Sequence, residues 1–161
     1  MNADIKTLLI VATSAFLLVL LLMSSYKRYK KNSFKRKANK QIPVDVDDFL
    51  SDWDKYRAID RPGCYIITIY NKKPKRSKLM ACKGYDEIYI GQSINVYRRV
   101  RNHFTGHGNG DVYADVKYGK AVYVRFVPCY KSQLNAVEKR LIDDYDATKS
   151  YNVTAGGSKR R

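Results

Sequence analysis

The chain has 161 residues, which is enough for one domain and little more. Its 31 lysines and arginines against 15 aspartates and glutamates give a formal charge of +16, which favours a polyanionic partner such as nucleic acid or an acidic membrane surface. The three cysteines, Cys64, Cys82 and Cys129, form no CxxC pair, which argues against a disulfide framework and a structural zinc site and fits a reducing compartment.

The first predicted element is a transmembrane helix over residues 7–26. These 20 residues carry no charge. As an α-helix at about 1.5 Å per residue they span about 30 Å, the thickness of a bilayer core. A cleaved signal peptide and a buried helix are the alternatives. The positive charge follows the apolar run and no small-x-small pattern closes it, which disfavours a signal peptide.

A basic juxtamembrane linker is expected next, at residues 27–42. Its first 14 residues hold eight basic side chains and no acidic one. Such a flank marks the cytoplasmic side of a membrane span, so the sequence predicts a single-pass membrane protein with its N-terminus outside and the rest of the chain in the cytoplasm. The lipid bilayer would then be a partner through residues 7–26. Residues 41–161 still carry a charge of +8, so the linker does not account for all of the excess.

Residues 43–60 are predicted to form a short amphipathic helix. Four apolar or aromatic residues recur there at helical spacing: Phe49, Leu50, Trp53 and Tyr56. This side is expected to pack on the domain that follows. The acidic residues of the segment are expected on a solvated face, with the shielding of a basic groove as the alternative.

Residues 61–157 are predicted to form one domain, followed by a basic tail at 158–161. β-Branched and aromatic runs predict strands at residues 63–70, 87–91 and 120–129. The first two strands read as a hairpin joined by a basic loop, and residues 106–111 read as another loop. Helices are expected after the second and third strands. The fold class is therefore α+β, with a small three-stranded, mostly antiparallel sheet flanked by helices.

The helix after the second strand can be capped by Ser93 or Asn95. At about 100° per residue, Arg99 and His103 lie one turn apart along the margin of the apolar stripe that begins at Val96. A snorkelling arginine and a histidine satisfied at a packing margin are the alternative to a functional pair.

The helix after the third strand places Glu138 inside an apolar stripe with Leu134, Leu141 and Tyr145. A carboxylate on a buried face is costly unless it is paired or binds a metal. A structural partner and a metal site both remain open for Glu138 from this pattern.

These motifs resemble the GIY-YIG nuclease superfamily over residues 63 to about 155. The two tyrosine motifs read Gly63-Cys64-Tyr65, with Cys in place of the usual Ile, and Tyr89-Ile90-Gly91. The family's helical arginine and the histidine of its phage homing members match Arg99 and His103. Its glutamate matches Glu138, and its closing asparagine after an aromatic residue matches Asn152. The two motif tyrosines are farther apart than in most members, because the basic loop at 71–84 lies between them.

The resemblance implies a metal-dependent DNA endonuclease, which the predicted helix at residues 7–26 would anchor in a membrane. It implies that Glu138 holds one divalent cation, Mg²⁺ or alternatively Mn²⁺. Tyr65 would accept a proton and Tyr89 would position water or phosphate. Arg99 would stabilise charge on the phosphate, and His103 would position the nucleophile or relay a proton. Gly91 and Asn152 would support the site.

Double-stranded DNA is the expected substrate, and no protein partner is identifiable. Four residues of the inserted loop are predicted to bind the DNA backbone: Lys72, Lys73, Lys75 and Arg76. The alternative for this loop is a solvated segment without contact to DNA. Two other functions remain open: a nucleic-acid-binding module without catalysis, and a membrane-tethered interaction protein.

Overall fold

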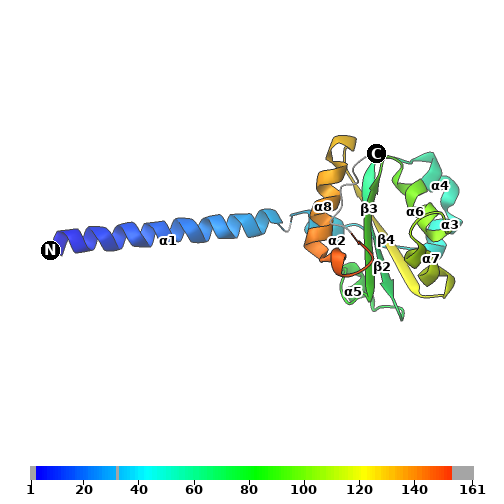
Figure 1. Ribbon diagram of the computed structural model, residues 1–161, viewed down its shortest axis with the longest axis horizontal. Helices are drawn as coiled ribbons and strands as arrows, with labels where there is room; N and C mark the ends of the chain where they lie inside the picture. Colours follow the sequence, from blue (N-terminus) through cyan, green and yellow to red (C-terminus); the bar gives the residue numbers. More distant parts are fainter. Residues whose placement is uncertain (1–2, 32, 154–161) are drawn as a thin grey trace. The chain divides into compact units, whose positions relative to one another are not determined.

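The computed structural model describes residues 3–31 and 33–153, with side chains described at 10–26 and 34–153. The chain divides into two units, Met1–Ser33 and Phe34–Arg161. The first contains one helix, α1 (Ala3–Lys31) (Figure 1). Within the described residues, no helix combines the length and the apolar character needed to cross a bilayer, so the predicted transmembrane helix is not supported. The orientation and localisation inferred from it stay predictions, and the predicted tail at 158–161 lies outside the described residues.

The second unit is built on one antiparallel sheet with the strand order β1-β4-β2-β3. The strands are β1 (Val44–Asp45), β2 (Gly63–Tyr70), β3 (Glu87–Ser93) and β4 (Ala121–Pro128). The three predicted strands and the hairpin are confirmed. The predicted count of three was wrong, because β1 adds a fourth strand at the edge. Its two residues are too few to show the alternation by which a strand is recognised in sequence.

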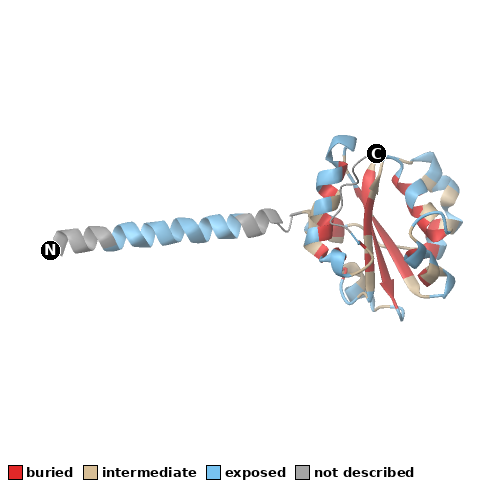
Figure 2. Cartoon of the chain, viewed as in Figure 1, coloured by how far each residue is buried: buried red, intermediate tan, exposed pale blue. Residues whose placement is uncertain are grey.

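Helices cover both faces of the sheet (Figure 1). One face carries α2 (Ser33–Asn39), α5 (Arg76–Met80) and α8 (Leu134–Tyr145). The other carries α3 (Val46–Ser51), α4 (Trp53–Ala58), α6 (Val96–Phe104) and α7 (Gly110–Lys117). Every residue of β2, the central strand with neighbours on both sides, is buried (Figure 2). Alternate residues of β2 therefore enter two separate cores, and Cys64 and Tyr65 of the first motif face opposite layers.

The segment predicted as one amphipathic helix at 43–60 is a short strand followed by two helices that meet at Asp52. The packing prediction is confirmed. Phe49 is fully buried, and its ring centroid lies 5.8 Å from that of Phe104 and 5.7 Å from that of Phe126, both in the domain that follows. The acidic residues of both helices are exposed, as expected for a solvated face.

Asn95, one of the two predicted caps, occupies the N-cap position of α6, but the expected side-chain hydrogen bond is not formed. The side chain of Asn95 makes no capping hydrogen bond, and Ser93 Oγ accepts only from the backbone N–H of Asn95. The Asp60 carboxylate instead accepts from the backbone N–H groups of Tyr97, at 2.9 Å, and Arg98, at 3.3 Å. The capping residue thus comes from the segment before β2, and it ties the start of α6 to the start of the central strand.

Both predicted loops contain a helix. The 71–84 loop includes α5, and the 106–111 segment includes the first two residues of α7. Asn109 caps α7, because its side-chain oxygen accepts from the backbone N–H of Val112 at 3.0 Å. In the sequence this helix start reads as a loop, because glycines at 106, 108 and 110 are typical of loops.

Candidate active site

Tyr65 and His103 form a buried pair between β2 and α6. Both side chains are almost completely buried, and Tyr65 Oη lies 2.7 Å from His103 Nε2. The sequence placed His103 at the margin of the apolar stripe. The structure buries it completely, because the turn before α7 folds over its ring.

The direction of this hydrogen bond follows from the other ring nitrogen. The backbone N–H of Asn109 lies 2.7 Å from His103 Nδ1. Because an N–H group only donates, Nδ1 accepts, and the neutral ring carries its proton on Nε2. Burial, helped by the charge of Arg99, lowers the pKa of His103 to about 4, so the ring is neutral at pH 7. His103 therefore donates to Tyr65 Oη, and the hydroxyl proton of Tyr65 remains available to another acceptor.

Two glycines allow this pair to form. A Cβ atom on Gly91 would lie 2.2 Å from Tyr65 Oη, and one on Gly108 would lie 2.5 Å from His103 Nδ1. Both contacts are far inside van der Waals distance, so neither position accepts a side chain without moving the pair. Sequence reasoning identified Gly91 and missed Gly108, although the glycines on either side of it were a visible signal.

Tyr89 and Arg99 complete this side of the site. The ring centroid of Tyr89 lies 6.2 Å from that of Tyr65 and 5.0 Å from that of His103. Arg99 is exposed on α6. Burial and the neighbouring Tyr89 raise the pKa of Tyr65 well above its usual value of 10, and the Arg99 guanidinium acts in the opposite direction. At pH 7 Tyr65 is thus a neutral phenol in the protein alone.

Glu138 reaches the site from α8, on the other face of the sheet. It is half-buried rather than buried, because it lies beside the stripe formed by Val137 and Leu141. Its Oε2 accepts from Gln92 Nε2 at 3.0 Å, and the same amide group donates to Asn135 Oδ1. Its charge adds to the raised pKa of Tyr65. Sequence reasoning missed Gln92 and Asn135, since single polar residues next to a motif give no spacing signal.

The GIY-YIG catalytic domain matches residues 61–152, which is more than half of the chain. This chain belongs to the GIY-YIG family. It matches no curated protein and no solved structure. Membership gives it a nuclease-type domain and implies a nucleic acid as its substrate.

Asn152, the last residue of the GIY-YIG match, hydrogen-bonds to the backbone at the outer edge of β3. Its Oδ1 accepts from the N–H of Ile90 at 2.8 Å, and its Nδ2 donates to the carbonyl of Ile90 at 2.7 Å. At Ile88, the N–H donates to Ser150 Oγ, and the carbonyl accepts from the backbone N–H of Tyr151. The 150–152 segment therefore satisfies the edge of β3 next to the second tyrosine motif and holds Tyr89 in place.

The four predicted DNA-binding residues lie elsewhere. They are exposed residues between β2 and β3, at the opposite end of β2 from Tyr65. Lys72, Lys73 and Lys75 line a cavity of about 440 Å³, whereas Arg76 begins α5 and does not line it.

The burial of His103 predicts a pH-dependent stability. A histidine with a folded pKa of about 4 and an unfolded pKa of about 6.5 contributes stability above pH 6.5 that is lost as the pH falls towards 4. We expect this loss to reach about 3 kcal/mol of unfolding free energy. Urea unfolding at pH 7 and pH 4.5 should show a steeper decline for the wild type than for His103→Gln. Equal declines in the two proteins would contradict the prediction.

Gly108→Ala should destabilise the fold through His103. The new Cβ would meet His103 Nδ1 and its Cα, at 2.5 and 2.9 Å, so the ring or the turn must shift. We expect a loss of about 1–3 kcal/mol of unfolding free energy, as for other overpacked sites. Gly110→Ala is the control two residues away, since a Cβ there meets nothing within 4 Å and alanine favours a helix. Thermal unfolding of the two variants checks this, and equal melting temperatures would refute it.

Proposed function

We propose that this protein is a metal-dependent endonuclease that hydrolyses phosphodiester bonds in DNA. The observation that carries this is the pairing of Tyr65 with His103 beside Tyr89 and Arg99, with Glu138 reaching the same region from the opposite layer. The charge of +8 on residues 41–161 supports a nucleic-acid partner. The resemblance of the motifs to the phage homing members supports DNA.

The donor set at Glu138 suits Mg²⁺ or Mn²⁺. Among the described residues, no three histidine, cysteine or acidic side chains gather to form a complete metal site. Mg²⁺ does not need one, since it keeps several waters and is usually bound by one or two carboxylates together with substrate phosphates. Glu138 would hold the ion. A bound divalent cation supplies a Lewis acid and neutralises charge on the phosphate.

The chain's own residues account for binding and proton transfer. Arg99, always charged and exposed, is available to the phosphate that gains charge during cleavage. Tyr65 is the proposed proton acceptor for the attacking water. It can accept only after its own hydroxyl proton has passed to hydroxide from the solvent, and the phenolate that results is stabilised by the Nε2–H of His103 and by Arg99. Neutral His103 thus positions Tyr65, and Tyr89 lies where it can orient water or phosphate.

Plasmid cleavage by the full chain tests the proposal. Supercoiled DNA should be nicked in Mg²⁺ or Mn²⁺ and should stay intact in EDTA. DNA binding without nicking, under every metal and salt condition, would instead support a nucleic-acid-binding module without catalysis. Nicking that persists in EDTA would contradict the role of a metal.

A further inference from the structure

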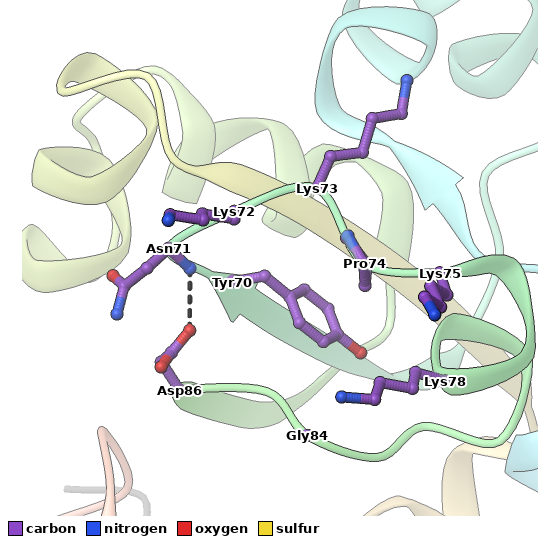
Figure 3. Close-up of a pocket in the computed structure, with 9 residues that line it drawn as sticks. All are labelled: Tyr70, Asn71, Lys72, Lys73, Pro74, Lys75, Lys78, Gly84 and Asp86. Atoms are coloured by element: carbon purple, nitrogen blue, oxygen red, sulfur yellow. Dashed lines mark hydrogen bonds between the residues drawn. The ribbon is translucent and has the colours of Figure 1, made fainter.

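A cationic cavity lies in the connection between β2 and β3, and we call it the hairpin pocket. Its volume is about 440 Å³, and its lining includes Tyr70, Lys72, Lys73, Lys75, Lys78 and Asp86 (Figure 3). Asp86 is the acidic member, and its Oδ2 accepts from the backbone N–H of Asn71 at 2.7 Å. The four lysine ammonium groups and the one carboxylate give the lining a net charge of +3.

Tyr70 gives the hairpin pocket a feature that a solvated basic loop lacks. The residue is only 2% exposed, and among residues 34–153 its hydroxyl finds no hydrogen-bond partner of good geometry, although the pKa of Tyr70, raised by burial, is partly lowered again by the neighbouring Thr68 hydroxyl. Figure 3 shows its ring lying across the pocket, with the hydroxyl pointing between Lys75 and Lys78. A buried hydroxyl without a partner costs about 1–3 kcal/mol. The hydroxyl is closed to solvent, so an anion reaches it when the exposed Lys75 and Lys78 side chains turn aside. The anion's oxygens would then accept from the hydroxyl and from both ammonium groups, which removes this cost.

We propose that the hairpin pocket binds a phosphodiester of the DNA backbone away from the bond that is cut. This rests on the proposed function. Tyr65 and Tyr70 lie on the same strand, five residues apart, which is about 16 Å at roughly 3.3 Å per residue, and their side chains face opposite layers of the sheet. One strand of B-DNA advances about 3.4 Å per nucleotide, so the pocket would contact a phosphate at least about five nucleotides from the scissile one. Its residues position the DNA and take no part in the chemistry.

Binding measurements on the full chain test the charge. Lys75→Gln/Lys78→Gln should bind closed circular DNA roughly tenfold more weakly at 0.15 M salt. The slope of log K against log salt should fall by about 0.9, since both lysines contact the same phosphate and each phosphate contact contributes about 0.9. Arg57→Gln/Lys117→Gln is the matched control, because it removes the same charge from exposed sites on α4 and α7, in the other helical layer. Equal losses in the two double variants would overturn the proposal.

Tyr70→Phe tests the hydroxyl separately from charge. Because the hydroxyl is unsatisfied within the part of the chain that the structure describes, its removal should leave thermal stability unchanged or slightly raised. DNA binding should nevertheless weaken about tenfold, as expected for a hydrogen bond to a charged group. Unchanged DNA binding by this variant would overturn the contact with phosphate.

Two further comparisons distinguish a failure of the proposed pocket from a failure of the proposed catalysis. In cleavage assays the pocket variants should raise KM and leave kcat unchanged. If the wild type cuts no DNA, the proposed catalysis fails, while the binding measurements still decide the pocket. A loss seen only with 5′-phosphorylated linear duplexes, and not with closed circular DNA, would assign the pocket to end phosphates and overturn a backbone site.

Discussion

Tyr65→Phe should reduce the rate of DNA cleavage about a hundredfold to ten-thousandfold, the range for loss of a positioned proton-transfer group. The phenyl ring keeps the packing of β2 but removes Oη, which is 2.7 Å from His103 Nε2. The buried Nε2–H is then left without its acceptor, so we also expect a loss of about 1–3 kcal/mol of unfolding free energy. Single-turnover cleavage and urea unfolding measure the two effects.

Tyr118→Phe is the control for this variant. It removes a phenolic hydroxyl from an exposed side chain at the end of α7, and it should leave both DNA binding and kcat unchanged. DNA binding by Tyr65→Phe should stay close to that of the wild type, which separates lost chemistry from lost affinity. A Tyr65→Phe protein that folds, binds DNA and cuts at the wild-type rate would remove Tyr65 from the mechanism.

The pH profile gives an independent readout on the same residue. Because burial and Tyr89 hold the pKa of Tyr65 above 10, the phenolate fraction is small at neutral pH and grows about tenfold for each pH unit. The wild-type cleavage rate should therefore rise between pH 7 and pH 9, and the residual rate of Tyr65→Phe should not follow it.

The parts of this site that sequence could predict are those set by local spacing. Two apolar runs joined by one loop predicted a hairpin with Tyr65 and Tyr89 on neighbouring strands, and the register confirms it, with Tyr65 opposite Gly91. Helical periodicity placed Arg99 and His103 on the same side of α6. The first inference uses segments that follow one another in the chain, and the second uses residues one helical turn apart, where backbone geometry fixes the relation between side chains.

The parts that sequence missed depend on contacts between distant segments. Asp60 caps α6 from before β2, and the backbone of Asn109 fixes the tautomer of His103 from the turn that follows α6. Gln92 meets Glu138 across a gap of 46 positions. No periodicity connects such pairs, because their proximity arises only when the helices have packed on the sheet.

The sequence predicted Glu138 to be more deeply buried than His103, and the structure shows the reverse for the same reason. A helical wheel shows only one helix, so it placed Glu138 inside a stripe and His103 at a margin. In the structure His103 is covered by the turn before α7, and Glu138 lies half-buried beside Gln92. What covers a helix face is decided by its neighbours. As a result, His103 is neutral and donates to Tyr65, whereas the Glu138 carboxylate remains accessible to solvent.

Glu138→Gln distinguishes two ways in which the carboxylate can act, because they predict opposite signs. The Glu138 charge contributes to the raised pKa of Tyr65, so removing that charge alone would favour the phenolate and speed cleavage at pH 7. If Glu138 instead holds the divalent cation, its loss removes about 4 kcal/mol of transition-state stabilisation, or about a thousandfold in rate. We expect the loss to dominate.

The measurement is single-turnover cleavage by Glu138→Gln over a range of Mg²⁺ concentrations, with calorimetric titration of Mg²⁺ and Mn²⁺. Glutamine keeps the size of the side chain and an oxygen for Gln92 to donate to, so the fold should persist. Asp143→Asn is the control, since it removes an exposed carboxylate from the same helix. A faster Glu138→Gln enzyme, or one with unchanged metal affinity, would show that the carboxylate acts only on Tyr65 and that the cation binds elsewhere.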